Sequence, residues 1–345
     1  MFRKRSFRKK FIVGAEKRND PVDTTEKKRS KESTAPTVKR HRRRSTKKKV
    51  HLDISYNRRF TSLTELRGSV IEREIPNIHG AYMMLSKKEP YIITAASSIR
   101  GNRPDQQDSY YVTDSAKVSP FRLNRSYAVV CDGMGGLESG ARASLTAVSM
   151  MKLGVRKLPT KQVDIPRFLS EMLDYIDYEV SHFDDLKTDK GAGTTFVTAF
   201  IENRRLYWAS VGDSTIFMFQ DGILKRITSR HNYRMFLDKL VENGKITAEQ
   251  AESDPRRHTL LSYLGMGGIA YRDINSKPYF LRNGDMLLLC TDGITDTLTY
   301  DELTQIIFDN YDDLYQCAHE ITRAASEKNR ETLDNSTVVI MQYTE

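Results

Sequence analysis

Short runs of apolar and β-branched residues, separated by turn residues, dominate the chain from Tyr91 onward. Runs of this length and composition predict β-strands. The predicted strands are residues 91–97, 109–112, 126–131, 195–201, 206–210, 215–219, 279–281, 286–290 and 337–342. Two pairs of residues between strands, Glu202-Asn203 and Asp221-Gly222, are typical of tight hairpin turns.

Apolar residues at helical spacing predict helices between these strands. The predicted helices are residues 138–154, 166–185, 233–243, 300–310 and 314–328. Pro166 suits the first turn of its helix, and Thr247-Ala-Glu-Gln250 has the form of a capping box that opens a further short helix. Runs of strands interleaved with pairs of helices favour an α+β fold, with antiparallel sheets flanked by helices, over strict β-α-β alternation.

Residues 1–50 differ from the rest of the chain in charge. They contain 20 Lys and Arg against 5 Asp and Glu, a net charge of +15, whereas the remaining residues carry 35 against 40, a net charge of −5. So polar a segment cannot bury enough apolar surface to offset its chain entropy, and we expect a disordered basic tail. We expect residues 51–87 to be a linker or N-terminal extension, and residues 88–345 to form the folded domain.

Three readings of the basic tail stay open. Its two clusters, residues 3–10 and 39–49, fit a plain solvated tail, an electrostatic contact with nucleic acid, anionic membrane or acidic proteins, or a nuclear signal if the source is eukaryotic. No apolar run approaches the roughly 18 residues of a membrane span, and the N-terminus lacks the apolar core of a secretory signal. We therefore expect no transmembrane segment.

The three cysteines are few and irregularly spaced, which argues against a disulfide framework. This usage fits a reducing compartment, and we expect a cytoplasmic protein. Cys131 and Cys290 each end an apolar run, so we expect both side chains to be buried.

Four aspartates lie at the ends of predicted strands, namely Asp108, Asp132, Asp292 and Asp334. Any one of them alone fits a turn former or a helix cap. Four presented in the same way indicate one site, because buried carboxylates without nearby cations need metal ions to neutralise them. Ligation by oxygen alone, with no histidine or cysteine cluster, favours Mg²⁺ or Mn²⁺ over zinc. A phosphate loop is excluded because no Lys-Ser/Thr follows the glycines after Asp132.

The motifs around these aspartates resemble those of the metal-dependent Ser/Thr protein phosphatases, the protein phosphatase 2C (PPM) family. They are Arg103…Asp108, Val130-Cys-Asp-Gly-Met-Gly-Gly136, Gly193-Thr-Thr195, Ser210-Val-Gly-Asp-Ser214, Cys290-Thr-Asp-Gly293 and Asp334-Asn-Ser-Thr-Val338. The resemblance covers roughly residues 88–345, and the stretch Leu240–Glu249 is similar to the bacterial branch in particular. It implies a four-layer α-β-β-α sandwich, two mainly antiparallel sheets flanked by helices, with a two-metal centre at one end.

The same resemblance implies a ligand set for two Mn²⁺ or Mg²⁺ ions. Asp132 would bridge the two ions, and the Gly133 carbonyl would ligate one of them. Asp292 and Asp334 would hold the other ion, and Asp108 would ligate directly or through water. Two bridged metals lower the pKa of a shared water, which gives a hydroxide near neutral pH.

The implied activity is hydrolysis of phosphoserine and phosphothreonine in proteins by direct attack of that metal-bridging hydroxide, without a covalent enzyme intermediate. Arg103 matches the family's phosphate-binding arginine, and its planar guanidinium can bind two phosphate oxygens at once. The implied partners are phosphorylated proteins of a signalling system with an opposing Ser/Thr kinase. The alternative is a catalytically weak phosphatase-fold scaffold or regulatory binding protein.

Four positions leave questions within this resemblance. Gln107 stands where the family carries a glutamate, which leaves the outer shell of the centre open. His231 is either a general acid for the leaving group or a surface or capping histidine. Asp189 is a candidate ligand for a third metal, and Asp213 is expected to be a structural turn carboxylate.

Overall fold

The computed structural model describes residues 90–118, 123–135, 137–183, 192–329 and 331–345. The expectations for the basic tail, residues 1–50, and for the extension, residues 51–87, lie outside the described residues, as does Asp189. None of the helices in the described ranges is both long enough and apolar enough to cross a membrane.

The first sheet has six antiparallel strands in the order β3-β1-β13-β12-β8-β9. The strands are β1 (Tyr91–Ile99), β3 (Ala116–Lys117), β8 (Thr215–Gln220), β9 (Ile223–Arg226), β12 (Met286–Cys290) and β13 (Ser336–Thr344). Strands β8 and β9 form a hairpin through Asp221-Gly222, whose φ angles of 51° and 78° are those of the predicted tight turn.

The second sheet has seven strands, with the path β10-β7-β6-β4-β2 and two short additions, β11 beside β7 and β5 beside β4. The strands are β2 (Asp108–Val112), β4 (Arg125–Met134), β5 (Gly193–Thr194), β6 (Phe196–Glu202), β7 (Arg205–Val211), β10 (Asp273–Ile274) and β11 (Tyr279–Phe280). All of its pairs are antiparallel. The predicted link between β6 and β7 is a tight turn in which Asn203 has a φ of 58°.

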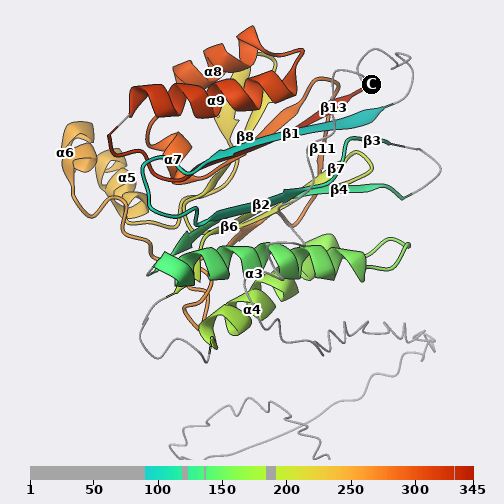
Figure 1. Ribbon diagram of the computed structural model, residues 1–345, viewed down its shortest axis with the longest axis horizontal. Coiled ribbons are helices and arrows are strands. Elements are labelled where there is room, and N and C mark those ends of the chain that lie inside the picture. The colour runs from blue at the N-terminus through green and yellow to red at the C-terminus, as the bar shows by residue number, and fades with distance from the viewer. Residues whose placement is uncertain (1–89, 119–122, 136, 184–191, 330) are drawn as a thin grey trace, which may run out of the picture. The chain divides into compact units, whose positions relative to one another are not determined.

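Helices cover the outer faces of both sheets (Figure 1). Helices α3 (Leu137–Arg156) and α4 (Ile165–Ser181) lie on the second sheet. Helices α7 (Asp292–Thr295), α8 (Tyr300–Asp309) and α9 (Leu314–Lys328) lie on the first sheet, while α5 (Arg234–Glu242) and α6 (Ala248–Ser253) stand together at one end. The predicted α-β-β-α sandwich is confirmed.

Side chains at the helix starts supply the hydrogen bonds that the first turns lack. Thr247 and Gln250 form the predicted capping box of α6, and Thr299 and Glu302 form a second one at α8. Helix α4 begins where predicted, with a proline in its first turn, but it ends at Ser181 and not at residue 185.

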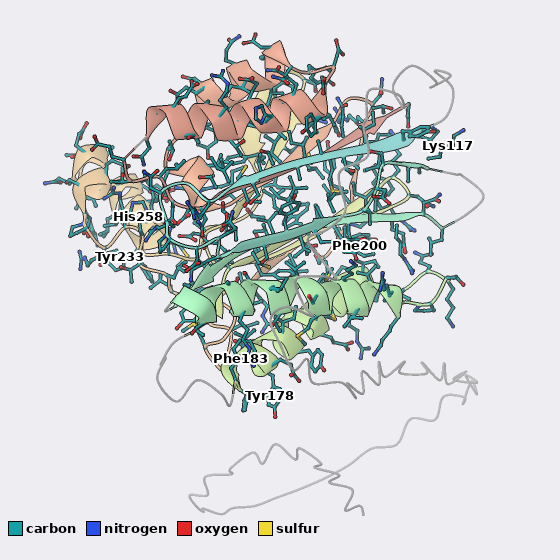
Figure 2. All side chains as sticks on the ribbon, viewed as in Figure 1. Lys117, Tyr178, Phe183, Phe200, Tyr233 and His258 are labelled. Carbon is teal, nitrogen blue, oxygen red and sulfur yellow. The ribbon has the colours of Figure 1, made fainter. Side chains whose placement is uncertain are left out.

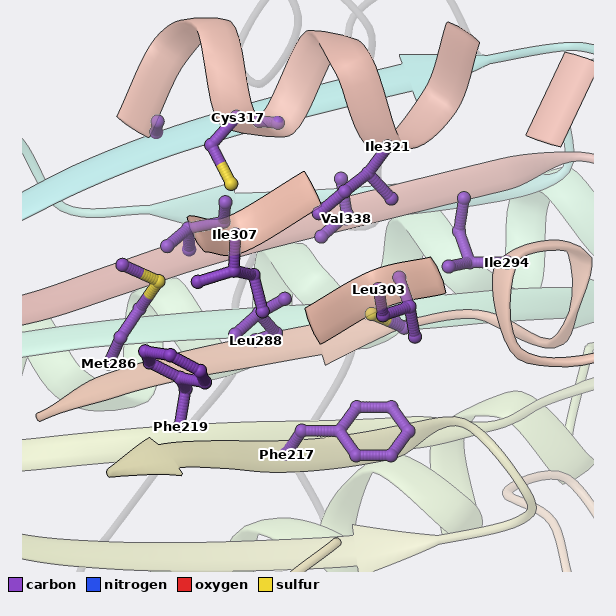
Figure 3. Packing of buried hydrophobic residues seen from close by; sticks show 14 of the residues in the cluster. Phe217, Phe219, Met286, Leu288, Ile294, Leu303, Ile307, Cys317, Ile321 and Val338 are labelled. Atoms are coloured by element: carbon purple, nitrogen blue, oxygen red, sulfur yellow. The ribbon is translucent and has the colours of Figure 1, made fainter. Parts of the chain in front are cut away.

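Alternating side chains of the first sheet fill two apolar layers, as the two-residue period of a strand requires. Leu287 and Leu289 of β12 face the layer between the two sheets, which also holds Val130 and Val197 of the second sheet. Met286, Leu288 and Cys290 face the opposite layer, beneath α8 and α9 (Figure 3). The predicted burial of Cys131 and Cys290 is confirmed, and all three cysteines are free thiols.

Candidate metal centre

Strands β2 and β4 place two of the predicted ligands directly opposite each other, Asp108 facing Asp132 in the antiparallel ladder. The prediction that Asp132 ends its strand is wrong, because β4 continues to Met134. The extra residues are held on both sides: the Gly133 amide donates to the Gln107 carbonyl at 3.1 Å, and Gly133 pairs with Thr194 of β5.

The other two aspartates come from neighbouring strands of the first sheet. Asp292 lies two residues beyond the end of β12 and is the first residue of α7, a helix that the sequence did not predict. Asp334 lies two residues before β13. Because Cys290 at the end of β12 pairs with Val338 near the start of β13, both aspartates lie at the same end of the sheet.

Two threonine hydroxyls fix the buried carboxylate of Asp108 between the sheets. Thr337 Oγ1 donates to Asp108 Oδ2 at 2.7 Å, and Thr291 Oγ1 donates to the same oxygen at 3.0 Å. The Thr337 amide in turn donates to Thr291 Oγ1 at 2.9 Å. Sequence reasoning missed both threonines, although each lies one to three residues from a predicted aspartate ligand.

Burial and mutual repulsion raise the pKa values of three of these carboxyl groups. Burial, together with the charge of Asp292, raises the pKa of Asp108 to about 7 against the two threonine hydrogen bonds. Burial, followed by the charge of Asp108, raises the pKa of Asp132 well above its ordinary value. Burial and the charge of Asp132 do the same for Asp292. The site therefore concentrates carboxyl groups whose charges repel one another, and in the described residues only Arg103, through Asp334, forms an ion pair with one of them.

Two carboxylate oxygens in this centre have no hydrogen bond within the described part of the chain. They are Asp108 Oδ1 and Asp292 Oδ1, both buried. Buried polar atoms are nearly always paired in native proteins, so an unpaired carboxylate oxygen calls for a cation or a water. The carboxyl groups of Asp132 and Asp292 lie within hydrogen-bonding reach of each other.

Arg103 lies at the open side of this centre, where it makes a two-point contact with Asp334. Its Nε donates to Asp334 Oδ1 at 2.8 Å, and its Nη2 donates to Asp334 Oδ2. The Arg103 side chain is 56% exposed and that of Asp334 is 39% exposed. The predicted phosphate-binding arginine and one predicted metal ligand are thus neighbours across 231 residues of sequence.

Asn335 ties the loop that carries Arg103 to the start of β13. Its Nδ2 donates to the carbonyls of Arg100 at 2.7 Å and Asp105 at 3.0 Å, and its Oδ1 accepts from the Gln107 amide at 2.7 Å. Gln107 therefore acts here mainly through its backbone, while its side-chain amide donates to the Gly135 carbonyl at 3.4 Å.

Glycines allow close backbone contacts at Gly133, a candidate ligand, and at Gly293, the residue after the candidate ligand Asp292. A methyl group at Gly133 would lie 2.1 Å from the Gly140 carbonyl oxygen, and one at Gly293 would lie 2.2 Å from the Asn335 carbonyl oxygen. Real side chains do not tolerate such distances, so only glycine fits at these two positions.

His231 is a buried histidine and not a surface one. It is 3% exposed, and its Nδ1 accepts a hydrogen bond from the Gly212 amide at 3.2 Å. Burial lowers its pKa, which favours the neutral ring. Asp213, the residue after Gly212, is also buried, and its Oδ2 accepts from Asn232 Nδ2 at 3.0 Å.

The donors present fit divalent cations in their chemistry. All the candidate ligands are oxygen atoms, and two buried carboxylate oxygens, those of Asp108 and Asp292, have no hydrogen bond within the described residues. Among these residues, no three side chains of histidine, cysteine, aspartate or glutamate lie close enough together to hold an ion. Asp334, one of the candidate ligands, is hydrogen-bonded to Arg103.

Comparison with known proteins identifies the class. Residues 97–334 match the protein phosphatase 2C family, so the chain belongs to that family. It is 30% identical over 198 residues to the serine/threonine phosphatase stp of Listeria monocytogenes, covering 56% of this chain and 76% of that protein. The bacterial-type resemblance seen in the sequence is confirmed, and the chain is a protein-serine/threonine phosphatase by family.

Solved structures agree with this assignment. The fold matches the Mycobacterium tuberculosis serine/threonine phosphatase PstP/Ppp with a TM-score of 0.60 and 26% identity, covering 74% of this chain and 100% of that chain. It also matches a PstP catalytic domain solved with two manganese ions, with a TM-score of 0.59, 25% identity and the same coverage.

Proposed function

We propose that this chain hydrolyses phosphoserine and phosphothreonine in proteins at a centre formed by Asp108, Asp132, Gly133, Asp292 and Asp334. The observation that carries the proposal is the pair of buried carboxylate oxygens, Asp108 Oδ1 and Asp292 Oδ1, that have no hydrogen bond within the described residues. Two Mn²⁺ or Mg²⁺ ions fit this donor set, and a relative of the chain was solved with two manganese ions. Bound there, they would supply a water of lowered pKa as the nucleophile and neutralise phosphate charge.

The chain's own residues would hold and orient this centre. Asp132 would hold the ions from β4, with the Gly133 carbonyl beside it. Asp292 and Asp334 reach it from the other sheet. The hydroxyls of Thr291 and Thr337 hold one oxygen of Asp108, which leaves the other oxygen free for a ligand or a water.

Arg103 would bind the phosphate of the substrate. Its guanidinium already makes a two-point contact with a carboxylate, which is the geometry that it would use for two phosphate oxygens. The exposed side chain can exchange Asp334 for the incoming phosphate while Asn335 keeps its loop in place. This exchange would also release Asp334 for metal binding.

Turnover of para-nitrophenyl phosphate and of a phosphothreonine peptide, with and without Mn²⁺, tests the proposal. We expect Mn²⁺-dependent hydrolysis that Asp132→Asn abolishes. Asp221→Asn is a matched control because Asp221 lies in the exposed β8–β9 turn at a φ that asparagine accepts. A wild-type chain that binds Mn²⁺ but hydrolyses neither compound would support the weak scaffold instead and refute the enzymatic proposal.

Phosphorylated proteins that oppose a Ser/Thr kinase are the proposed substrates, and three free buried cysteines fit a cytoplasmic setting. We further propose that residues 1–50, with their net charge of +15, bind polyanions. Replacing the basic residues of 39–49 by glutamine should weaken salt-sensitive binding to heparin or RNA and spare turnover of para-nitrophenyl phosphate. Equal loss of both properties would contradict a separate role for this segment.

A further inference from the structure

Three arginines follow one another from the end of β9 into α5. Arg226 is the last residue of β9, Arg230 lies in the loop that follows, and Arg234 is the first residue of α5. Tyr233 and His258 mark this end of the molecule in Figure 2, beside α5 and α6. Arg226 and Arg230 are both half-buried.

The backbone around Arg230 is fixed to the side of the metal centre. The amide of His231 donates to the Gly212 carbonyl at 2.9 Å, and Asn232 Nδ2 donates to Asp213 Oδ2 at 3.0 Å. Asp213 raises the pKa values of both Asp132 and Asp292 through its charge, so it lies next to the proposed ligands. Arg230 is thus held beside the centre by the residues that follow it.

A second connection reaches the same place from α7. The Asp296 amide donates to the Asp292 carbonyl at 2.8 Å, and Asp296 Oδ2 lies 3.0 Å from His258 Nδ1. Burial raises the pKa values of Asp213 and of Asp296, and the charge of Arg230 opposes this rise at both carboxyl groups, although no ion pair joins it to either one in the described residues. Arg230 therefore borders the centre on the α5–α6 side.

Other arginines in this region already have acidic partners. Arg234 Nη1 lies 2.6 Å from Glu252 Oε2, and Arg256 Nη2 lies 2.7 Å from Asp254 Oδ2. Within the described ranges, the guanidinium groups of Arg226 and Arg230 have neither a hydrogen bond nor an ion pair, although the backbone of Arg226 pairs with Phe217 of β8. Burial, followed by the charge of Arg230, lowers the pKa of Arg226, so the two guanidinium groups repel each other. An anion between or beside them would relieve this repulsion.

We propose that Arg226 and Arg230 form an anion subsite beside the metal centre, which binds an acidic or phosphorylated side chain of the protein substrate a few positions from the scissile phosphoresidue. This inference rests on the proposed phosphatase function and adds a substrate preference to it. A carboxylate and a second phosphate share the required chemistry, since both offer charged oxygens to a planar guanidinium. The α5–α6 side would then select phosphoproteins with anionic flanks.

Three phosphothreonine peptides test the subsite: one with neutral flanks, one with aspartates in the flanks, and one with a second phosphoserine there. The measured quantity is the ratio of kcat/KM for each anionic peptide to that for the neutral peptide, for wild type and for Arg226→Gln and Arg230→Gln in the full chain. We expect wild type to prefer at least one anionic peptide, by about tenfold, since a charge-assisted hydrogen bond has that magnitude. Each substitution should reduce the ratio several-fold.

Arg156→Gln is the matched control. Arg156 is an exposed arginine at the end of α3, a helix of 20 residues that begins near the centre and so carries it about 28 Å away. The ratio should keep its wild-type value in this variant. A wild-type ratio near one, or an unchanged ratio in both test variants, would overturn the subsite. Absence of Mn²⁺-dependent turnover of the neutral peptide would instead refute the phosphatase proposal, so the two failures are distinct.

Discussion

Gly133→Ala tests the close backbone contact at the centre. The added methyl group would lie 2.1 Å from the Gly140 carbonyl oxygen and 2.8 Å from the Gln107 carbonyl oxygen, both of which are backbone atoms. Ordinary contact begins at 3.4 Å, so β4 and the start of α3 must separate by about 1.3 Å, which is 3.4 less 2.1. A shift of that size would move the Gly133 carbonyl and the adjacent Asp132 together.

The shift has two consequences of different size. Overpacking of about 1–3 kcal/mol should lower the melting temperature by about 2–10 °C. Displacement of ligands by about 1 Å should weaken Mn²⁺ binding by about 10- to 100-fold and reduce kcat/KM by about 100-fold. Differential scanning calorimetry and isothermal titration with Mn²⁺ measure the two effects separately.

Gly268→Ala is the control for this experiment. Gly268 is exposed, a methyl group there would have nothing within 4 Å, and its φ lies outside the left-handed region. It should therefore keep the wild-type melting temperature and Mn²⁺ affinity. If Gly133→Ala also kept both, the backbone contact with Gly140 would not position the centre, and the reasoning would be wrong.

The clamp on Asp108, the start of α8 and the buried cysteines each lead to a separate prediction. Thr337→Val removes one hydrogen-bond donor to Asp108 and should weaken Mn²⁺ binding about tenfold, as measured by calorimetry. Thr304→Val is the control, because the Thr304 hydroxyl donates to the Tyr300 carbonyl on α8, and this variant should keep the wild-type affinity. Equal Mn²⁺ affinities in the two variants would contradict the role of Thr337 in holding Asp108. The hydrogen bond from Lys328, followed by that from the Thr299 amide, lowers the pKa of Glu302 to about 2. The ionised Glu302 therefore contributes its full stabilisation of the fold above pH 4.5, the pKa of the unfolded chain, and this contribution is lost as the pH falls through about 2. Glu302→Gln should accordingly destabilise the fold by about 0.2–1 kcal/mol at pH 7, since solvent screens this exposed pair, and the difference in melting temperature should disappear near pH 2; a difference independent of pH would show that the charge contributes nothing. All three thiols are buried, and burial raises the pKa of Cys317 to about 12, so a thiol reagent at pH 8 should label none of them until the chain is unfolded in guanidinium; rapid labelling of the native protein would refute this packing.

Local patterns were sufficient to predict most of the fold. The nine predicted strands and six predicted helices all occur, because short apolar runs and helical spacing report on which segments and faces are buried. Strands β3, β5 and β10, of two residues each, were missed, as was β9. Such short strands are defined by their partners and not by their own composition, as the pairing of β5 with the end of β4 shows. The extent of β4 beyond Asp132 depends on that same partner.

The candidate ligands follow from the family motifs, but their connections do not. The motifs contain Asp108, Asp132, Asp292 and Asp334, and strand pairing directs all four toward one end of the sheets. The bond between Arg103 and Asp334 joins residues 231 positions apart, and the Thr337 hydroxyl reaches Asp108 across 229. No periodicity carries such information, because these contacts form only when distant segments pair and pack in the folded chain.

His231 shows the limit of reasoning from one motif. The sequence left it as a general acid or a surface or capping histidine, and the surface position is wrong because it is a buried residue that accepts a hydrogen bond from Gly212. Its neighbours Arg230 and Asn232 differ in role, since Asn232 bonds Asp213 while Arg230 has no partner in the described part of the chain. The same stretch of sequence therefore supplies both structural support and a candidate substrate contact.

We propose above that the aspartates at this end of the sandwich hold a pair of catalytic metal ions. Anomalous diffraction at the manganese edge, from crystals of the full chain soaked in Mn²⁺, would locate such ions. We expect two peaks about 3.5–4 Å apart, with the Asp132 carboxylate between them and Asp292 and Asp334 on one side. No peak beside Asp132, at Mn²⁺ concentrations that support turnover, would contradict it.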